Sequence, residues 1–327
     1  MKIRITDSKT ADLREWENIW AHCEYATFFH SPEWMNIWHH YYDGLISPRS
    51  QHISFSDGKS AILVVSVKTR FNGWVSIHES SPGHSYGGWI SLDELTPDHA
   101  ELLSLYLFNH YPNLIWRINP FDPLNTSVHN NFSFKDDRAF TVPLKLSWDD
   151  LHKRMKKRKI VKKVKLADNS GFTLRKLGVE SLDEYQSIYD EARERWAQKG
   201  AQGAVYNMSL FESFFKSEYC DFWGVFHDSR LICAGPVFRS KAHVVCWLTL
   251  AKTEYLPKKP YEFFYYNLIS YYKGQGYSWF DFNPSGGLKG LEHFKKGFAT
   301  TEFPCPVLDT RPAYMVVLQN IKSSLSS

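Results

Sequence analysis

Residues 276–298 read GYSWFDFNPSGGLKGLEHFKKGF, and this stretch carries the strongest structural signals in the chain. A helical pattern over 260–273 starts at a proline, and the glycine at 276 predicts its end. The residues that follow alternate in type, which predicts a strand over 277–282. In that strand two phenylalanine rings share one face and Asp281 lies on the other.

A glycine-bearing loop follows this strand, and a short helix over 291–298 comes next. Phe294 and Phe298 are four residues apart, so both rings lie on one face of that helix and anchor it. We therefore predict the order helix, strand, loop and short helix for the last part of the fold.

The residues before this stretch predict helices followed by an antiparallel sheet. A capping box, SLDE (181–184), opens a helix with a regular aromatic and aliphatic face. A first strand is expected at 172–177, and three further strand-like runs alternate with turns at 221–226, 231–238 and 243–250.

A strongly basic segment precedes this half. The capping box SWDD (147–150) opens a helix that contains HKRMKKRKIVKKVK (152–165) and ends near the breaker DNSG (168–171). Such a run is either a solvated helix face, a contact for the phosphates of a tRNA, or a contact for a nucleotide-linked substrate. The lysines expected to bind a polyanion are Lys156, Lys157, Lys162 and Lys163.

The first half has a similar order of elements. Helices are expected at 10–23, 28–38 and 96–110, a hairpin at 51–55 and 61–70, and strands at 74–79, 114–118 and 139–146. We predict an α/β (α+β) protein with two copies of one fold and mixed, mostly antiparallel sheets. The expected boundaries are 1–146 for the first domain, 147–170 for the basic interdomain helix and 171–327 for the second domain.

Composition fits a soluble protein of two domains. The chain has 327 residues, 43% hydrophobic and 23% charged, and its net charge is +4. Five cysteines without a CxxC pair predict free thiols in a reducing compartment. The N-terminus lacks the apolar core of a signal peptide, so we expect a cytoplasmic protein without a membrane span. Scattered histidines and the lack of nucleophile or phosphate-loop motifs disfavour a metal site and a hydrolase.

The motifs together resemble a known superfamily of acyltransferases. Residues 276–298, the helix start YLPKKPYEFF (255–264), FFHSPEW (28–34) and SYGG (85–88) are similar to segments of the Fem-type peptidoglycan-bridge aminoacyltransferases and their GNAT-like acetyltransferase relatives. The resemblance implies two tandem acetyltransferase-like domains. It also implies transfer of an amino acid from aminoacyl-tRNA to an amine of a cell-wall precursor, or the use of an acyl-CoA.

The donor can be judged from the expected position of a pyrophosphate loop. Simple acetyltransferases hold the cofactor pyrophosphate on backbone N–H groups, which requires glycines in the loop. The corresponding residues here, 251–263, include no glycine. The lysines at 252, 258 and 259 either meet phosphates or belong to a solvated loop. This favours a tRNA-borne donor, with the donor as a substrate and no bound cofactor.

The resemblance also implies residues that bind substrate. Arg195 lies where relatives place an arginine for the diphosphate of a nucleotide-linked acceptor, and its alternative is a surface arginine paired with Glu191 or Asp190. Trp34 and Tyr86 come from the two first-half motifs. Asp281 either faces the substrate cleft or is a structural acid satisfied by backbone donors.

Three residues are candidates for catalysis. Relatives carry an acid–proline pair at the end of a first-domain strand, but here the pair is Asn119–Pro120, and an asparagine cannot accept a proton. Asp122, three residues on, is the candidate replacement. Lys295 belongs to the FK-x-x-F segment and lies about 100° around the helix from Phe294, from where an ammonium can enter the domain cleft. There it either neutralises the charge on a carbonyl oxygen or holds the terminal phosphate or ribose end of the donor, and the alternative is a plain surface lysine.

We predict an N-acyltransferase in which an amine attacks an acyl carbonyl held between the domains, without a covalent enzyme intermediate. The main alternative is an acyl-CoA-dependent enzyme acting on a sugar or polysaccharide precursor. A second alternative is an inactive RNA- or partner-binding module on the same fold, since the expected acid is missing at Asn119.

Overall fold

The computed structural model describes residues 2–70, 75–128, 134–198, 200 and 205–315. The chain divides into two compact units. The first contains Met1–Arg138 and Phe303–Ser327, and the second contains Ala139–Glu302. Each has its own mixed sheet and helices, so the expected α/β fold class is confirmed.

The first unit builds one sheet and three helices of two or more turns. Its strands are β1 (Ile5–Thr10), β2 (Ile46–Pro48), β3 (Gln51–Phe55), β4 (Ser60–Val64), β5 (Ser66–Arg70), β6 (Val75–Glu79), β7 (Tyr86–Ile90), β8 (Leu114–Ile118) and β17 (Val307–Asp309). Its helices are α1 (Leu13–His22), α2 (Pro32–Tyr41) and α3 (Pro97–His110), with short 3-10 turns η1 (Phe28–His30), η2 (Pro82–His84) and η3 (Asn125–Ser127). The strands follow the order β1-β3-β4-β7-β8-β6-β5-β2, and β17 pairs with β8.

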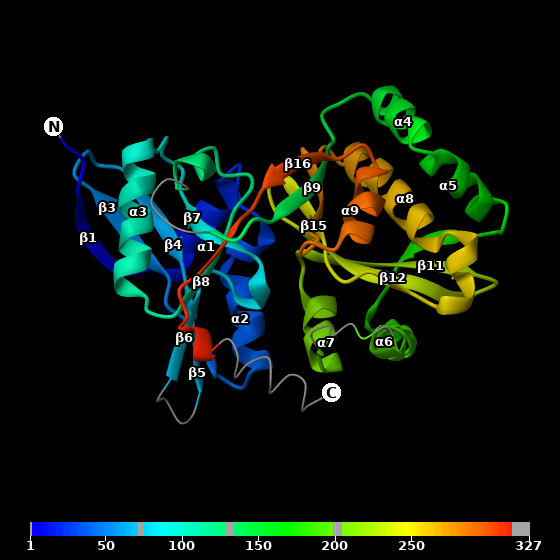
Figure 1. Cartoon of the computed structure of the whole chain (residues 1–327), viewed down its shortest axis with the longest axis horizontal. Helices are drawn as coiled ribbons and strands as arrows, with labels where there is room; N and C mark the ends of the chain where they lie inside the picture. The colour runs from blue at the N-terminus through cyan, green and yellow to red at the C-terminus, as the bar shows by residue number, and fades with distance from the viewer. Residues whose placement is uncertain (1, 71–74, 129–133, 199, 201–204, 316–327) are drawn as a thin grey trace. The chain divides into compact units, whose positions relative to one another are not determined.

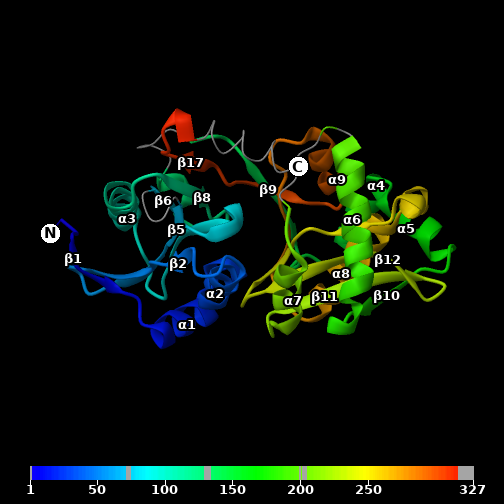
Figure 2. The same cartoon turned by 90° about the horizontal axis from the view of Figure 1, so that it is seen from below.

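Helices cover both faces of this first sheet (Figures 1 and 2). The core beneath α3 contains Ala100, Leu103 and Leu107 from the helix, together with Trp89 and Trp116 from the sheet. The other core holds the aromatic residues of α1, η1 and α2, which are packed edge to face at several points. The high aromatic content of the chain is therefore largely core packing in this unit.

The second unit is also a layered fold of one sheet and helices. Its strands are β9 (Arg138–Pro143), β10 (Thr173–Lys176), β11 (Cys220–His227), β12 (Arg230–Arg239), β13 (His243–Cys246), β14 (Leu250–Ala251), β15 (Trp279–Pro284) and β16 (Thr301–Pro304). Its helices are α4 (Trp148–Lys157), α5 (Ile160–Asp168), α6 (Leu182–Gln198), α7 (Met208–Lys216), α8 (Pro260–Gly274) and α9 (Lys289–Lys296), with η4 (Val179–Ser181) and η5 (Thr253–Lys258). The sheet order is β10-β11-β12-β13-β15-β9-β16, and β14 pairs with β12.

The helices of the second unit also lie on both faces of the sheet. Helices α6 and α7 pack on β11, β12 and β14, while α8 packs on the opposite face and α5 packs on α8 (Figure 1). The core around α8 contains Phe263, Phe264 and Leu268 with Phe280 and Phe298. Helix α8 precedes β15 in the sequence and α9 follows it, and this core joins both segments to the strand. It therefore positions the end of β15.

The same crossover occurs once in each unit. In the first, β7 and β8 pair in parallel and are joined through α3; in the second, β13 and β15 pair in parallel and are joined through α8. Parallel neighbours need a connection that returns the chain to the same edge, and a helix provides it. The carboxyl ends of parallel strands are where α/β folds bind ligands, so these two ends are the places to look for a site.

The unit boundaries differ from the expected domain ranges. Strand β9 lies within the range 1–146 assigned to the first domain, but it pairs antiparallel with β15 in the second sheet. Strand β17 lies within the range 171–327, but it pairs with β8 in the first sheet. Pairing between distant segments decides both memberships, and no local pattern encodes it.

The basic segment 147–170 forms two helices in place of the single helix expected. Ser147 caps α4, as predicted, through a hydrogen bond from the Asp150 N–H. Lys159 then adopts a left-handed conformation with φ 65°, which ends one helix and begins the next. After the break, Ile160 and Val161 begin the buried face of α5, which also includes Val164 and Ala167.

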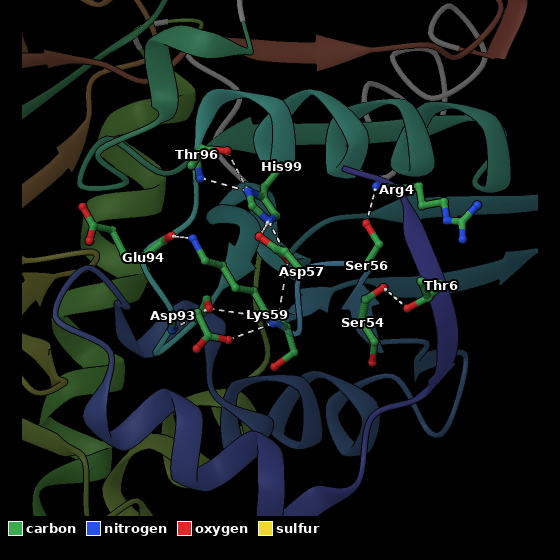
Figure 3. A network of polar contacts seen from close by, with 12 residues as sticks. Arg4, Thr6, Ser54, Ser56, Asp57, Lys59, Asp93, Glu94, Thr96 and His99 are labelled. Carbon is green, nitrogen blue, oxygen red and sulfur yellow. Dashed lines mark hydrogen bonds and ion pairs between the residues drawn. The ribbon is translucent and has the colours of Figure 1, made fainter. Parts of the chain in front are cut away.

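One histidine of the first unit has a structural role that its neighbours define (Figure 3). The His99 Nδ1 atom accepts the Thr96 N–H at 3.1 Å, which caps α3. Because Nδ1 is the acceptor, the ring proton lies on Nε2, which faces Asp57 Oδ2 at 3.2 Å. This Asp–His pair therefore joins the β3–β4 turn to the start of α3, and its ring has no free acceptor for use as a base.

Candidate functional site

The parallel strands β13 and β15 separate at their carboxyl ends. Their register runs from His243 opposite Trp279 to Val245 opposite Asp281. Beyond that point a side chain connects the two strands in place of backbone pairing: Asn283 Nδ2 donates to the Cys246 carbonyl at 2.7 Å. Asn283 has a φ of 61°, a conformation that asparagine tolerates better than most residues. A single side chain thus spans the point where the two strands diverge.

Lys295 supports this turn from α9. Its side chain is 4% exposed, and its ammonium donates to the Asn283 carbonyl at 2.7 Å and the Pro284 carbonyl at 3.0 Å. Lys296 is more exposed, as expected, and forms an ion pair with Glu302 at 2.9 Å. The structure therefore places a buried positive charge at the carboxyl end of β15, while the proposed catalytic role of Lys295 stays a prediction.

Asp281 is fully buried beside this charge. Its Oδ1 accepts the Asn283 N–H at 2.9 Å, so it takes part in holding the same turn. Burial raises the pKa of the Cys246 thiol, and the negative charge of Asp281 raises it further against the opposing effect of Lys295. A thiol in this state is protonated and a poor nucleophile. The arrangement favours stabilisation of charge over covalent catalysis.

Asn119 ends the equivalent strand of the first unit, β8. Its Nδ2 donates to the Tyr25 carbonyl at 2.9 Å, and its Oδ1 accepts the Phe121 N–H at 3.1 Å. Both ends of the amide therefore bind backbone groups and fix the turn after β8. The candidate catalytic role of Asn119 stays a prediction.

Asp122 lies in the same turn and is largely buried. Burial raises the pKa of this carboxyl to about 7, against the opposing effect of the Leu124 N–H, which Oδ1 accepts at 2.9 Å. A carboxyl that titrates near neutral pH is suited to accept a proton during catalysis. A residue that replaces the acid missing at Asn119 needs such a raised pKa. The catalytic role of Asp122 stays a prediction.

Trp34 and Tyr86 lie in the core of the first unit. Trp34 is fully buried, and its indole N–H contacts the Pro82 carbonyl and the Ser85 hydroxyl, both at 3.1 Å. Tyr86 is also fully buried and packs against Phe29. The two family-like motifs are therefore brought together, but in this structure neither ring presents a surface to a ligand.

Arg195 contacts the loop after β14. Its Nη1 donates to the Thr253 hydroxyl at 2.7 Å and to the Ala251 carbonyl at 3.2 Å. The expected contact with an acceptor diphosphate stays a prediction. The structure adds that Arg195 lies beside the loop 251–263, where the sequence analysis sought the donor pyrophosphate.

The helices α4 and α5 present most of their cations to solvent. The exposed cations are Lys153, Arg154, Lys156, Lys157, Arg158, Lys159, Lys162 and Lys165. Among the described residues none of these eight side chains has an ion pair or a hydrogen bond. Lys163 differs, because its ammonium lies 3.1 Å from the Glu262 carboxylate in the first turn of α8. We call the eight unpaired cations the basic surface.

Two residues of this region carry roles that the sequence analysis did not assign. Asn283 bridges the diverging strands, and Glu191 accepts the Thr253 N–H at 2.6 Å. The repeated Asn–Pro dipeptide at 119–120 and 283–284 is a signal for the first, since each pair follows a strand expected at the end of a crossover. No local signal identifies the second, because Glu191 and Thr253 are 62 residues apart; Glu191 was expected only as an alternative ion-pair partner of Arg195.

Comparison with known proteins supports this assignment of the fold. Residues 154–296 match the family model of the acetyltransferase (GNAT) domain. The crystal structure of FemX is similar with a TM-score of 0.68 at 12% identity, covering 95% of this chain and all of FemX. A search of curated proteins by sequence finds no significant match.

Two further structures have a similar fold. The C-terminal domain of a putative lysylphosphatidylglycerol synthetase from Agrobacterium fabrum has a TM-score of 0.54 at 11% identity, covering 83% of this chain and 87% of that one. L-PGS from Bacillus licheniformis has a TM-score of 0.50 at 12% identity, covering 84% and 88%. With the GNAT match, the expected resemblance to Fem-type, GNAT-like acyltransferases is confirmed, and the chain is an acyltransferase whose residues 154–296 match a GNAT domain.

Proposed function

We propose that this acyltransferase moves an aminoacyl group from aminoacyl-tRNA to an amine of a nucleotide-linked cell-envelope precursor, of the kind used to build peptidoglycan. The similarity to FemX supports the choice of reaction, and the lysylphosphatidylglycerol synthetase names point to lysyl transfer in proteins of similar fold. Charged tRNA and nucleotide-linked precursors are cytoplasmic molecules, so the reaction is assigned to the cytoplasm. No helix in the described part of the chain has the length and apolar character needed to span a membrane.

The observation that carries the proposal is the basic surface. Eight exposed cations on two short helices and the break between them have no acidic partners among the described residues, and they form a local positive field in a chain whose net charge is only +4. Cations of this kind bind a polyanion by releasing its condensed counterions, which gives affinity without sequence preference. A tRNA body fits this requirement, because its phosphates are spread over a large surface.

The basic surface adjoins the segment where a donor is expected. Helix α5 packs against α8 and also contacts η5, and Lys163 reaches the first turn of α8 through its ion pair with Glu262. The start of α8 lies at the crossover between β13 and β15. The basic surface and the buried Lys295 charge therefore belong to the same unit.

The proposed reaction is a direct transfer. The acceptor amine attacks the ester carbonyl, the bond between the carbonyl carbon and the ribose oxygen breaks, and a proton passes from the amine to the leaving hydroxyl. The positive charge of Lys295 at the end of β15 favours the negative charge that grows on the carbonyl oxygen. Asp122, with a pKa near 7, is the candidate to accept the amine proton. Alignment of the two reactants supplies a further part of the rate enhancement.

The experiment measures tRNA binding against salt concentration. The variant Lys156→Gln, Lys157→Gln and Lys162→Gln should weaken binding and reduce the slope of log K against log salt by roughly 2–3, since each phosphate contact contributes about 0.7–0.9. The control changes three exposed lysines of the first unit, Lys2, Lys9 and Lys135, to Gln. Equal slopes in wild type and the first variant would show that the basic surface is only solvated.

Lys163 provides a sharper internal comparison. Its charge is already paired with Glu262, so Lys163→Gln should change the salt slope less than Lys162→Gln, its neighbour on the basic surface. Activity is then tested by transfer from radiolabelled aminoacyl-tRNA to a UDP-linked muropeptide. Label that never reaches this class of acceptor would contradict the proposed substrate.

One observation favours a second candidate. The match of residues 154–296 to an acetyltransferase domain is what an acyl-CoA-dependent enzyme on a sugar or polysaccharide precursor would also give. The same transfer assay with acetyl-CoA in place of charged tRNA separates the two donors.

A further inference from the structure

Three residues on one face of α6 hold the loop that follows β14. Ser187, Glu191 and Arg195 are spaced by four residues, so their side chains lie along one stripe of the helix. The Lys252 ammonium donates to the Ser187 hydroxyl at 3.2 Å, and the Thr253 N–H donates to Glu191 Oε1 at 2.6 Å. We call these three residues the α6 clasp.

The Glu191 carboxylate has the surroundings of a bound anion. It receives the backbone N–H at the start of η5, and the positive charges of Lys252 and Arg195 lie near it. Partial burial raises the pKa of Glu191, but the hydrogen bonds from Thr253 and these two charges outweigh that effect and lower it. The group is therefore a carboxylate at neutral pH, and it satisfies the donors that this loop would otherwise offer to a ligand.

A second carboxylate stands at the start of α8. Glu262 lies in the first turn, with its side chain 9% exposed, and it forms the ion pair with Lys163. Negative charge in the first turn satisfies the positive end of a helix. The N-cap residue, Lys259, has a left-handed φ of 67° and offers no side-chain cap. Both helical starts that follow β14 thus have a carboxylate of the protein itself beside them.

This arrangement does not fit the pyrophosphate of an acyl-CoA, the donor that the GNAT fold implies. A pyrophosphate needs backbone N–H groups open to close approach, commonly in a loop with glycine. Here 251–263 contains no glycine, the Thr253 N–H is taken, and Arg230 holds the Glu254 carboxylate at 2.9 Å. An incoming pyrophosphate would meet two fixed carboxylates in addition to its desolvation cost.

We propose that the α6 clasp sets donor specificity: Glu191 fills the anion position between β14 and α8 and makes this unit select against acyl donors that bring a pyrophosphate to that loop. The clasp proposal extends the proposed function. It rests on that function for one point: that an accepted donor places its phosphates on the basic surface. Arg195 in this role is a positioning residue, because it orders the loop through Thr253 and Ala251.

The experiment measures binding of acetyl-CoA to the full chain by titration calorimetry. Wild type should show no saturable binding up to ~1 mM, the upper end of the range usual for enzyme substrates. Glu191→Ala removes the carboxylate and frees the Thr253 N–H, so it should bind acetyl-CoA at least tenfold more tightly than wild type. The matched control is Glu194→Ala, which changes an exposed glutamate on the same helix and should behave as wild type.

Two results would overturn the clasp. One is saturable binding of acetyl-CoA by wild type within the tested range. The other is a folded Glu191→Ala protein, with a cooperative thermal transition, that binds acetyl-CoA no better than wild type. Binding of tRNA is measured on the same samples and should not differ between wild type and Glu191→Ala. If wild type does not bind tRNA but Glu191→Ala gains acetyl-CoA binding, the proposed function is contradicted and the selection against acyl-CoA by Glu191 still holds.

Discussion

The two units end their crossover strands with the same dipeptide and surround it with opposite charges. Asn119–Pro120 follows β8, and Asn283–Pro284 forms the last two residues of β15. In the first unit a carboxyl, Asp122, is buried in the turn, whereas in the second an ammonium, Lys295, donates to the turn carbonyls.

The two asparagines also bind different partners. Asn119 accepts the Phe121 N–H within its own turn and donates to the distant Tyr25 carbonyl, while Asn283 reaches across to the neighbouring parallel strand. The two strand ends thus differ in their buried ionisable group, which is a carboxyl in the first unit and an ammonium in the second. A carboxyl with a raised pKa can accept a proton, and a fixed cation can stabilise negative charge, so each strand end can be tested separately.

The largest effect is expected from Asp122→Asn, which removes the acid of the first turn. Burial raises the pKa of Asp122 from 3.8 to about 7, so the folded state binds this proton more tightly than the unfolded chain. Its contribution to stability is therefore full below pH ~4 and is lost as the pH rises through 7, by up to ~4 kcal/mol. Asp122→Asn cannot ionise, so its free energy of unfolding should exceed that of wild type at pH 8 and approach it at pH 4.

Urea unfolding at the two pH values checks this prediction. The pH dependence of kcat/KM gives an independent readout, because a base with this pKa requires wild-type activity to rise through pH 7 and Asp122→Asn to lose that rise. If the difference in unfolding free energy between wild type and Asp122→Asn is the same at both pH values, the pKa of Asp122 is not raised. The first strand end then has no buried proton acceptor to contrast with Lys295.

The next effect concerns Lys295, the cation of the second turn. Lys295→Ala should lower kcat by a hundredfold or more, because one fixed electrostatic contact commonly contributes about 3–4 kcal/mol to the transition state. The melting temperature should also fall, since two buried carbonyls lose their donor. Lys295→Arg retains the charge and should restore part of kcat.

Lys296→Ala is the matched control, because Lys296 lies on the same helix with its charge paired to Glu302 near the surface. An exposed pair of this kind contributes little, about 0–1 kcal/mol. If Lys295→Ala loses melting temperature but keeps kcat, the lysine only holds the turn.

The smallest effect separates the two asparagines. Asn283→Gly permits the φ of 61° and removes the bridge to Cys246, while Asn119→Ala removes one hydrogen bond within its turn and one to the Tyr25 carbonyl. Each should lower the free energy of unfolding by about 1–3 kcal/mol. We expect Asn283→Gly to lower kcat as well, because the turn that it fixes is the one that holds Lys295, and thermal unfolding with steady-state kinetics measures both. If Asn283→Gly and Asn119→Ala change kcat equally, the turn at the end of β15 and the turn after β8 do not differ in their importance for catalysis.

Much of the local structure could be predicted from the sequence. The cap at Ser147, the helix starting at Pro260, the strand through Asp281 and the pair Phe294 and Phe298 depend on residues within a few positions of one another. Repetition of the same order of elements indicated two units. Periodicity and capping chemistry act over short distances along the chain, so a linear sequence contains them.

Only the tertiary structure decided which distant groups meet. The sequence did not place β9 in the second sheet or β17 in the first, and it did not predict the break at Lys159. The Glu191 contact joins residues 62 apart, and the buried position of Lys295 depends on α9 packing beside β15. Such contacts depend on the free energy of packing whole elements together. That packing decides which face of a helix lies against a loop that is far away in the sequence. The sequence therefore determined the kinds of residues available to the site, and packing determined which of them bind each other.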